Sequence, residues 1–199
     1  MHTGRQLTEA LNKVSAPSLF GVFYRSISEA AIHSLKPPEP LYSLGARRKG
    51  QRFTPKNGPS CLYLSEQFDV SFIETNGTAL SIVAHGHGFT PPPTVIIAIN
   101  VNVEHMLDLT DPVVRMALAT NQDELAGPWL EQMLLKQPVP THILARAAHR
   151  CNRFEAIRFQ SMQRKGGVNV MVWPKKLRNP YCIEVHDPSH RLYQRIPPA

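Results

Sequence analysis

The chain has 199 residues, of which 42% are hydrophobic, and a formal net charge of +7 at pH 7. This length and apolar content are enough to bury the core of one domain. No apolar run approaches the roughly 20 residues that a transmembrane helix needs, and residues 1–16 lack the apolar stretch of a signal peptide, so we expect a soluble, cytoplasmic protein.

The net positive charge is compatible with nucleic-acid binding, but its pattern is not typical of it. Basic residues gather in three short clusters, at residues 47–49, 164–165 and 175–176. Aromatic residues do not alternate with them, as they would on a surface that stacks the bases of a single strand. An anionic small molecule, an acidic protein partner or solubility alone explains the charge equally well. We expect no direct binding of nucleic acid.

Neither the cysteines nor the histidines form a metal-binding pattern. Cys61, Cys151 and Cys182 include no Cys-x-x-Cys pair, and three thiols cannot all pair within one chain. We therefore expect reduced, structural cysteines. His85 and His87 have no matching second pair of ligands, so we predict no metal site.

The beginning of the chain predicts a helix followed by a strand. Leu7, Leu11 and Val14 share one helical face, and Pro17 ends that pattern. Residues 22–25 read as a strand because they are β-branched and aromatic up to the final arginine.

Arg25 ends this predicted strand. A guanidinium in that position can bind a phosphate through two hydrogen bonds, although pairing with a carboxylate is equally compatible. Ser28 is a suitable cap for a second helix, which the prolines within residues 37–40 would end.

Residues 50–74 predict a turn, a short strand and a helix in close succession. Residues 56–59, Lys-Asn-Gly-Pro, are a turn signal, and residues 61–64 read as a strand. Ser65 can cap a helix, which Asn76-Gly77 would break.

This segment carries an arginine, a tyrosine and a glutamate at equal spacing: Arg52, Tyr63 and Glu74. The predicted elements place Arg52 before the turn, Tyr63 on the strand and Glu74 near the end of the helix. Taken singly, each has a structural explanation, as a solvated surface charge, a core aromatic ring and an exposed helical carboxylate. The three together are our main candidates for a functional site.

The second half of the chain mixes strands and helices. Residues 95–103 are the longest β-rich run, and we expect a central strand that is buried on both faces over its first half. Asp111 followed by Pro112 is a typical helix start, and another helix is predicted over residues 128–135. We expect Trp129 on that helix to belong to the core.

A helix, two strands and a hairpin complete the chain. Thr141 can cap a helix whose apolar face would pack on the sheet. Residues 154–160 and 168–173 predict two strands. Ser161 ends the first of these, where its hydroxyl can bond either a substrate or the nearby backbone. Residues 181–196 predict a terminal hairpin.

Because strands and helices are mixed without strict alternation, the residues alone predict an α+β sheet fold in a single domain. The chain contains neither a Gly-x-Gly-x-x-Gly sequence nor a Walker loop. This argues against NAD as a hydride carrier and against hydrolysis of nucleoside triphosphates.

Several of these motifs, in this order, resemble the RES-domain family, which is named for an arginine, a glutamate and a serine. The family pattern is Gly-x-Arg-aromatic-Asn, then a strand with tyrosine, then a helix with glutamate. Five residues match it: Gly50, Arg52, Phe53, Tyr63 and Glu74. Thr54 stands where the family has asparagine. Further resemblance covers residues 23–25, 140–145, 154–161 and 167–169, so the likeness extends over about residues 20–175.

The resemblance implies an ADP-ribosyltransferase-like split β-sheet with flanking helices. It implies a RES-like catalytic domain over residues 20–199, preceded by an N-terminal helical extension over residues 1–19. Members of the family consume NAD+ as toxins of toxin–antitoxin pairs. NAD+ would therefore be a substrate, with no cofactor, and an antitoxin encoded nearby would be the protein partner.

The resemblance also implies a set of site residues. Arg52, Glu74 and Ser161 would be catalytic, with Glu74 stabilising the cation-like ribose that forms when the bond to nicotinamide breaks. Three further residues would bind the substrate: Arg25, Tyr63 and Asn169. The ring of Tyr63 suits stacking on nicotinamide, and an arginine fork suits the pyrophosphate.

We therefore predict a toxin that degrades NAD+ by cleaving its nicotinamide–ribose bond, with water or phosphate as acceptor. One alternative is an ADP-ribosyltransferase that modifies a protein target, and another is a non-catalytic basic binding protein. The sequence leaves open the acceptor, the oligomeric state, the identity of the antitoxin, and whether Arg25 or Arg52 is the main contact to phosphate.

Overall fold

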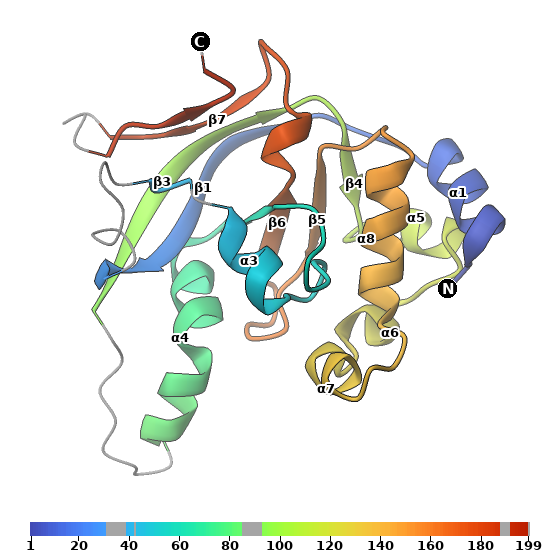
Figure 1. Cartoon of the computed structure of the whole chain (residues 1–199), viewed down its shortest axis with the longest axis horizontal. Helices are drawn as coiled ribbons and strands as arrows, with labels where there is room; N and C mark the ends of the chain where they lie inside the picture. The colour runs from blue at the N-terminus through green and yellow to red at the C-terminus, as the bar shows by residue number, and fades with distance from the viewer. Residues whose placement is uncertain (31–38, 42, 85–92, 188–191, 199) are drawn as a thin grey trace.

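One eight-stranded sheet forms the centre of the protein (Figure 1). The computed structural model describes residues 1–30, 39–41, 43–84, 93–187 and 192–198. The strand order is β4-β5-β6-β2-β1-β3-β7-β8, and all neighbours are antiparallel except β4 and β5. The strands are β1 (Leu19–Ser28), β2 (Leu62–Ser65), β3 (Thr94–Val103), β4 (Met106–Asp108), β5 (Ala156–Gln160), β6 (Val168–Val172), β7 (Cys182–Val185) and β8 (Arg195–Ile196).

The helices flank this sheet, which makes the protein an α+β single domain as predicted. They are α1 (Gly4–Lys13), α3 (Leu44–Lys49), α4 (Phe68–Ala84), α5 (Pro112–Ala117), α6 (Gln122–Ala126), α7 (Trp129–Leu134), α8 (Pro140–Arg150) and the 3-10 helix η1 (Pro174–Lys176). Figure 1 shows α1 and α8 together at one end of the sheet and α4 below the other. Within the described residues, no helix is long and apolar enough to cross a membrane.

The two halves of the sheet meet at a single pair of residues. β1 pairs with β3 along its whole length, and β2 pairs with β6 along its whole length. Between β1 and β2, in contrast, only Tyr24 and Ser65 are partners. No other pair joins these two strands, so the sheet is split at its middle, as the family resemblance implies.

The two faces of the sheet bury two separate apolar clusters, because side chains alternate along a strand. On β6, Met171 contributes to the cluster that also contains α1 and α8, whereas Val170 and Val172 contribute to the other. The first cluster therefore joins the N-terminal helix to the rest of the fold.

The predicted strand over residues 95–103 is present as β3, but it is not buried on both faces. Ile97, Ile99, Val101 and Val103 are buried, while the residues between them are partly or fully exposed. The opposite face of β3 is thus open to solvent, so the apolar run gives an alternating strand between β1 and β7.

Ser65, which was predicted to cap a helix, is the last residue of β2, and α4 begins only at Phe68. Ser28 is the last residue of β1, and residues 29–30 directly after it are helical, so its position before a helix agrees with the prediction. The rest of the helix predicted there lies outside the described residues.

Asn76-Gly77 does not break α4, which continues to Ala84. The amide of Asn76 donates to the carbonyl of Phe72 at 3.0 Å, so this side chain bonds within the helix. A Cβ on Gly77 would lie 3.2 Å from Oε1 of Gln163. The glycine lets the loop after β5 approach the helix.

Thr141 does not cap α8 either. Val139 is the N-cap and Pro140 opens the helix, while the Thr141 hydroxyl donates to the backbone carbonyl of Arg52. Asp111, by contrast, caps α5 as predicted, with its carboxylate accepting from the N–H of Val113 at 2.8 Å.

The N-terminal helix is firmly packed onto the domain. Leu7 and Leu11 are 1% and 0% exposed and belong to the same apolar cluster as Leu144 and Ala148 of α8. The helix therefore contributes to the core, and the boundary between an extension over residues 1–19 and the catalytic domain stays a prediction.

Leu11→Ala is expected to lower the free energy of unfolding by about 2–5 kcal/mol, because it leaves a cavity at a fully buried position. Urea denaturation measures this change. Asn12→Ala, one residue further along the exposed face, is the matched control and should leave stability nearly unchanged. Equal stability of the two variants would show that α1 is dispensable for the core.

Candidate functional site

A cavity of about 570 Å³ opens where the sheet is split. Its walls come from β1, β2, β6, α4 and the segment between α3 and β2. Five of the six predicted site residues line it: Arg25, Arg52, Tyr63, Glu74 and Asn169. The split thus brings together residues that are up to 144 positions apart in the chain.

Glu74 is held by two side chains, one from β6 and one from the residue that follows β5. Its Oε1 accepts from the Ser161 hydroxyl at 2.6 Å and from the Asn169 amide at 2.7 Å. Its Oε2 has no hydrogen-bond partner among the described residues. The two bonds to Oε1 therefore orient the carboxylate, and Oε2 remains able to accept a hydrogen bond from a ligand.

Ser161 lies behind Glu74 and does not line the cavity. Its hydroxyl donates its one hydrogen to Glu74 and accepts from the N–H groups of Gln163 and Arg164, each at 3.1 Å. The hydroxyl predicted to bond a substrate is thus already committed, and the geometry gives it the role of positioning Glu74.

Asn169 is fixed in turn by Ser65. The Ser65 hydroxyl donates to Oδ1 of Asn169 at 2.7 Å, which leaves the amide nitrogen to donate to Glu74. Both Ser65 and Asn169 are buried and are partners in the β2–β6 ladder. A rigid part of the sheet therefore sets the position of the carboxylate.

Arg52 is buried, with 7% of its surface exposed. Its Nε and Nη2 donate to the carbonyl of Leu125, at 2.9 and 2.6 Å, and its Nη1 donates to the carbonyl of Gln160 at 2.9 Å. Three of the five guanidinium hydrogens are thereby used, and two remain for a ligand. Burial lowers the pKa of Arg52 to about 10, and the nearby charge of Glu74 opposes that shift.

Arg52 also lies against two aromatic rings that are in contact with each other. Its Cζ lies 5.4 Å from the ring centre of Phe53 and 5.3 Å from that of Phe159. These contacts and the carbonyls hold the guanidinium in one place, so it fastens the segment before β2 to the end of β5 as well as facing the cavity.

The hydroxyl of Tyr63 makes hydrogen bonds within the protein that the sequence did not predict. Its hydroxyl accepts from the N–H of Phe53 at 3.0 Å and lies 3.0 Å from the hydroxyl of Thr54, which also contacts Sγ of Cys61 at 2.6 Å. Thr54, where the family has asparagine, thus makes its own hydrogen bonds here. Burial raises the pKa of Tyr63 well above its ordinary value and that of Cys61 to about 12, so both groups stay neutral.

The charges around the cavity are mostly positive. Arg25, Lys49 and Arg52 line it together with a single carboxylate, Glu74. Nη1 of Arg25 donates to the carbonyl of Pro40 at 2.6 Å, and burial lowers its pKa to about 10. Both arginines keep their charge at neutral pH. The cavity therefore suits an anion that also carries one electron-poor centre near Glu74.

Sequence reasoning missed several lining residues. Trp129, expected in the core, is half-buried and lines the cavity. Lys49 belongs to a basic cluster with no distinguishing neighbour except Gly50, which starts the Arg52 motif. Ser65 was interpreted as a helix cap. The only sequence signal for Lys49 was that it directly precedes Gly50, where the motif with Arg52 begins.

Gly167 allows the serine-bearing loop to lie against α4. A Cβ on this residue would come within 2.8 Å of Cγ2 of Val70 and 3.1 Å of Cβ of Ser161. The N–H of Ser161 donates to the carbonyl of Gly167 at 2.8 Å and closes the loop. Glycine is thus needed here for close approach.

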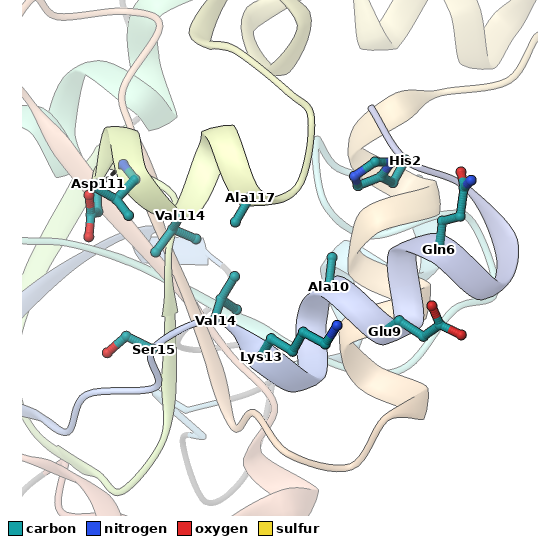
Figure 2. Close-up of a pocket in the computed structure, with 11 residues that line it drawn as sticks. His2, Gln6, Glu9, Ala10, Lys13, Val14, Ser15, Asp111, Val114 and Ala117 are labelled. Atoms are coloured by element: carbon teal, nitrogen blue, oxygen red, sulfur yellow. Dashed lines mark hydrogen bonds between the residues drawn. The ribbon is translucent and has the colours of Figure 1, made fainter.

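A smaller cavity, of about 480 Å³, lies between α1 and α5 (Figure 2). Figure 2 shows Ala10 and Val14 of the N-terminal segment opposite Val114 and Ala117 of α5. None of the predicted site residues lines it. It lacks the clustered cations of the first cavity.

The described residues contain one group that can hold a metal ion, formed by Glu104, His105 and Glu155, whose ligand atoms lie within 4.8 Å of one another. None of the three lines the cavity around Glu74. Oε2 of Glu155 already accepts from two backbone N–H groups. His85 and His87 lie outside the described residues.

The protein is therefore an α+β domain in which Glu74 lines a cavity at the point where the sheet is split. The family model of the RES domain matches residues 17–193, and the chain belongs to this family. At the level of the family, this supports an enzyme that uses NAD+ and acts as a toxin.

Among solved structures, the chain is similar to the M. tuberculosis MbcT–MbcA toxin–antitoxin complex, with 16% sequence identity and a TM-score of 0.67. The match covers 92% of this chain and 91% of the other. At this identity the likeness shows the fold. No curated protein matches the chain in a sequence comparison.

Tyr63→Phe is expected to lower the free energy of unfolding by about 1–3 kcal/mol, because it leaves the buried N–H of Phe53 without a partner. Urea denaturation is the measurement. Tyr24→Phe is the control, since its hydroxyl has no hydrogen bond among the described residues. If both variants are as stable as the parent protein, the Tyr63 hydroxyl does not hold the Arg52-Phe53 turn.

Proposed function

We propose that this protein cleaves the nicotinamide–ribose bond of NAD+, with water or phosphate as the acceptor. The observation that carries the proposal is the geometry of Glu74, a carboxylate oriented by Ser161 and Asn169 in a cavity that is otherwise cationic. This combination suits a substrate with negative phosphates and a ribose that becomes positive during reaction.

Breaking the bond to nicotinamide gives the ribose oxocarbenium character, so a nearby anion lowers the energy of the transition state. Oε2 of Glu74 would accept from a ribose hydroxyl, while Oε1 stays on Ser161 and Asn169. The bonding electrons leave with nicotinamide, which departs as a neutral molecule. The acceptor oxygen then bonds to the ribose carbon and releases a proton.

The cations would bind the pyrophosphate. Arg52 offers two guanidinium hydrogens, and Arg25 and Lys49 line the same cavity. Since the Arg52 guanidinium is already held by Leu125 and Gln160, it would meet the phosphate with little further loss of conformational freedom.

Two rings that line the cavity would contact the flat groups of NAD+. Tyr63 lines the cavity from β2 and Trp129 from α7. Because the Tyr63 hydroxyl is used by Phe53, only its ring is available for stacking on nicotinamide. Trp129 would contact another part of the substrate.

A single incubation tests the activity. Purified protein with NAD+ should release free nicotinamide, in the presence and absence of phosphate, and the product formed identifies the acceptor. Label from NAD+ on added protein would instead indicate an ADP-ribosyltransferase. If no nicotinamide is released and no protein is labelled, the result would indicate a binding protein without catalytic activity.

Glu74→Gln is expected to lower kcat by roughly 10²- to 10³-fold with little change in KM, because it removes the charge that matters most in the transition state. Circular dichroism shows whether the variant is folded. Glu131→Gln, on the exposed part of α7, is the control for loss of one carboxylate. If the folded Glu74→Gln variant has a near-normal kcat, Glu74 is not the carboxylate that faces the ribose.

We also propose that an antitoxin covers the mouth of this cavity. An apolar hollow adjoins it, sharing Trp129 and Met162 with the cavity lining. Leu130, Leu134 and Leu135 line this hollow and are 50%, 70% and 60% exposed. Exposed leucines grouped beside a site are typical of a surface that binds a protein partner.

Leu134→Asp is expected to weaken the complex with the antitoxin at least about tenfold, since a charge would be buried in an apolar contact. NAD+ cleavage should be unchanged, because Leu134 does not line the cavity. Co-purification with the neighbouring gene product measures the first effect. Met116→Asp on α5, where the residue is 75% exposed, is the control, and equal loss in both variants would place the partner elsewhere.

A further inference from the structure

A cavity of about 710 Å³ lies apart from the one around Glu74, and the two share no lining residue. It is lined by α3, residues 58–60, the connection between β3 and β4, the end of α8 with the turn that follows it, and the segment around η1. Helices α3 and α8 can be followed in Figure 1. Its walls thus come from five separate parts of the chain.

Five cationic side chains line this second cavity: Arg47, Arg153, Lys175, Lys176 and Arg178. They face two carboxylates, Glu104 and Glu155, which lie together beside His105. Two of the three basic clusters in the sequence therefore meet here in space. The folding of the chain, and not the sequence alone, makes this concentration of charge.

Part of the basic wall is held rigidly. Nζ of Lys176 donates to the carbonyls of His149 and Phe154, at 2.7 and 3.1 Å, and lies 5.3 Å from the ring centre of Trp173. Arg178 donates to the carbonyls of Lys175 and Leu177. Lys176 therefore offsets the negative end of α8, which would otherwise repel an anion.

Arg47 and Lys175 are the side chains left for a ligand. Both are exposed, and neither makes a hydrogen bond or ion pair among the described residues. They belong to α3 and η1, two separate parts of the chain that both line the cavity. An anion in the cavity could contact these two cations, which no carboxylate among the described residues neutralises.

We propose that this second cavity binds a small molecule that carries several phosphate groups. Because several cations line a cavity of this volume, it suits a compact molecule with several negative charges better than a single phosphate. Nucleic acid fits less well, because Trp173, the tryptophan that lines the cavity, is only 3% exposed and has no free ring face on which a base could stack. The site is independent of the NAD+ activity proposed above.

The second cavity also adjoins the segment that carries Arg52. Arg47 of α3 lines it, whereas Ala46 and Lys49 of the same helix line the cavity around Glu74. A ligand bound on one side of α3 would therefore contact a helix that forms the wall of the other cavity.

The two tryptophans of the chain report on the two cavities separately, since Trp129 lines one and Trp173 the other. Titration of Trp129→Phe protein with inorganic tripolyphosphate should change the fluorescence of Trp173 in a saturable manner. Titration of Trp173→Phe protein shows how much of the anion enters the cavity around Glu74 instead. A response in Trp129 alone would overturn the proposal.

Arg47→Ala/Lys175→Ala in the Trp129→Phe background is expected to raise the Kd for tripolyphosphate at least about tenfold, because two charge-assisted contacts are lost. Arg48→Ala/Lys165→Ala removes the same charge from exposed positions that line neither cavity, and should leave the Kd within about twofold. Equal weakening by both pairs would show a general effect of net charge and overturn the site.

A short single-stranded oligonucleotide provides the remaining comparison. Tighter binding of the oligonucleotide than of tripolyphosphate, lost with Arg47 and Lys175, would replace a small ligand by nucleic acid. Glu74→Gln protein should bind tripolyphosphate like the parent, since Glu74 is not part of this cavity. That result separates failure of the second site from failure of the proposed NAD+ activity.

Discussion

The arrangement of the candidate site depends on the two hydrogen bonds that Oε1 of Glu74 accepts from Ser161 and Asn169. They connect α4 to the end of β5 and the beginning of β6, and Ser65 extends the connection into β2. Every member except Glu74 is anchored in the sheet or at its end. The helix therefore supplies the charge, and the sheet determines where that charge is held.

The split of the sheet gives this carboxylate a cavity to face. A continuous ladder between β1 and β2 would close the space, whereas the single pair of Tyr24 and Ser65 leaves it open. Arg52 compensates for the missing ladder, because its guanidinium bonds carbonyls of two other segments. The same side chain thus supports the open architecture and contributes positive charge to it.

The sequence predicted most long elements better than the contacts among the candidate residues, although it predicted a break at Asn76-Gly77 within α4. The periodicity of α1 and the β-rich run of β3 were visible because each extends over ten residues, whereas α3 and α6 have six and five residues and carry little periodic signal. Ser161 was found through the family motif, but its role behind Glu74 follows from a contact across 87 positions. Tyr63 likewise gained a structural bond that only the turn at Phe53 explains.

A backbone hydrogen bond between Ser161 and Gly167 closes the loop that follows β5. It separates the residues that hold Glu74 from the side chains of the loop that are free to vary. The bond from the N–H of Ser161 to the carbonyl of Gly167 forms a neck, and residues 162–166 beyond it are exposed. Within this stretch the backbone N–H groups of Gln163 and Arg164 bond the Ser161 hydroxyl, so the backbone there helps to hold Glu74. The side chains of Met162 and Gln163 line the cavity from the same loop. A substitution of either side chain would therefore change the rim of the cavity while leaving the carboxylate beneath it in place.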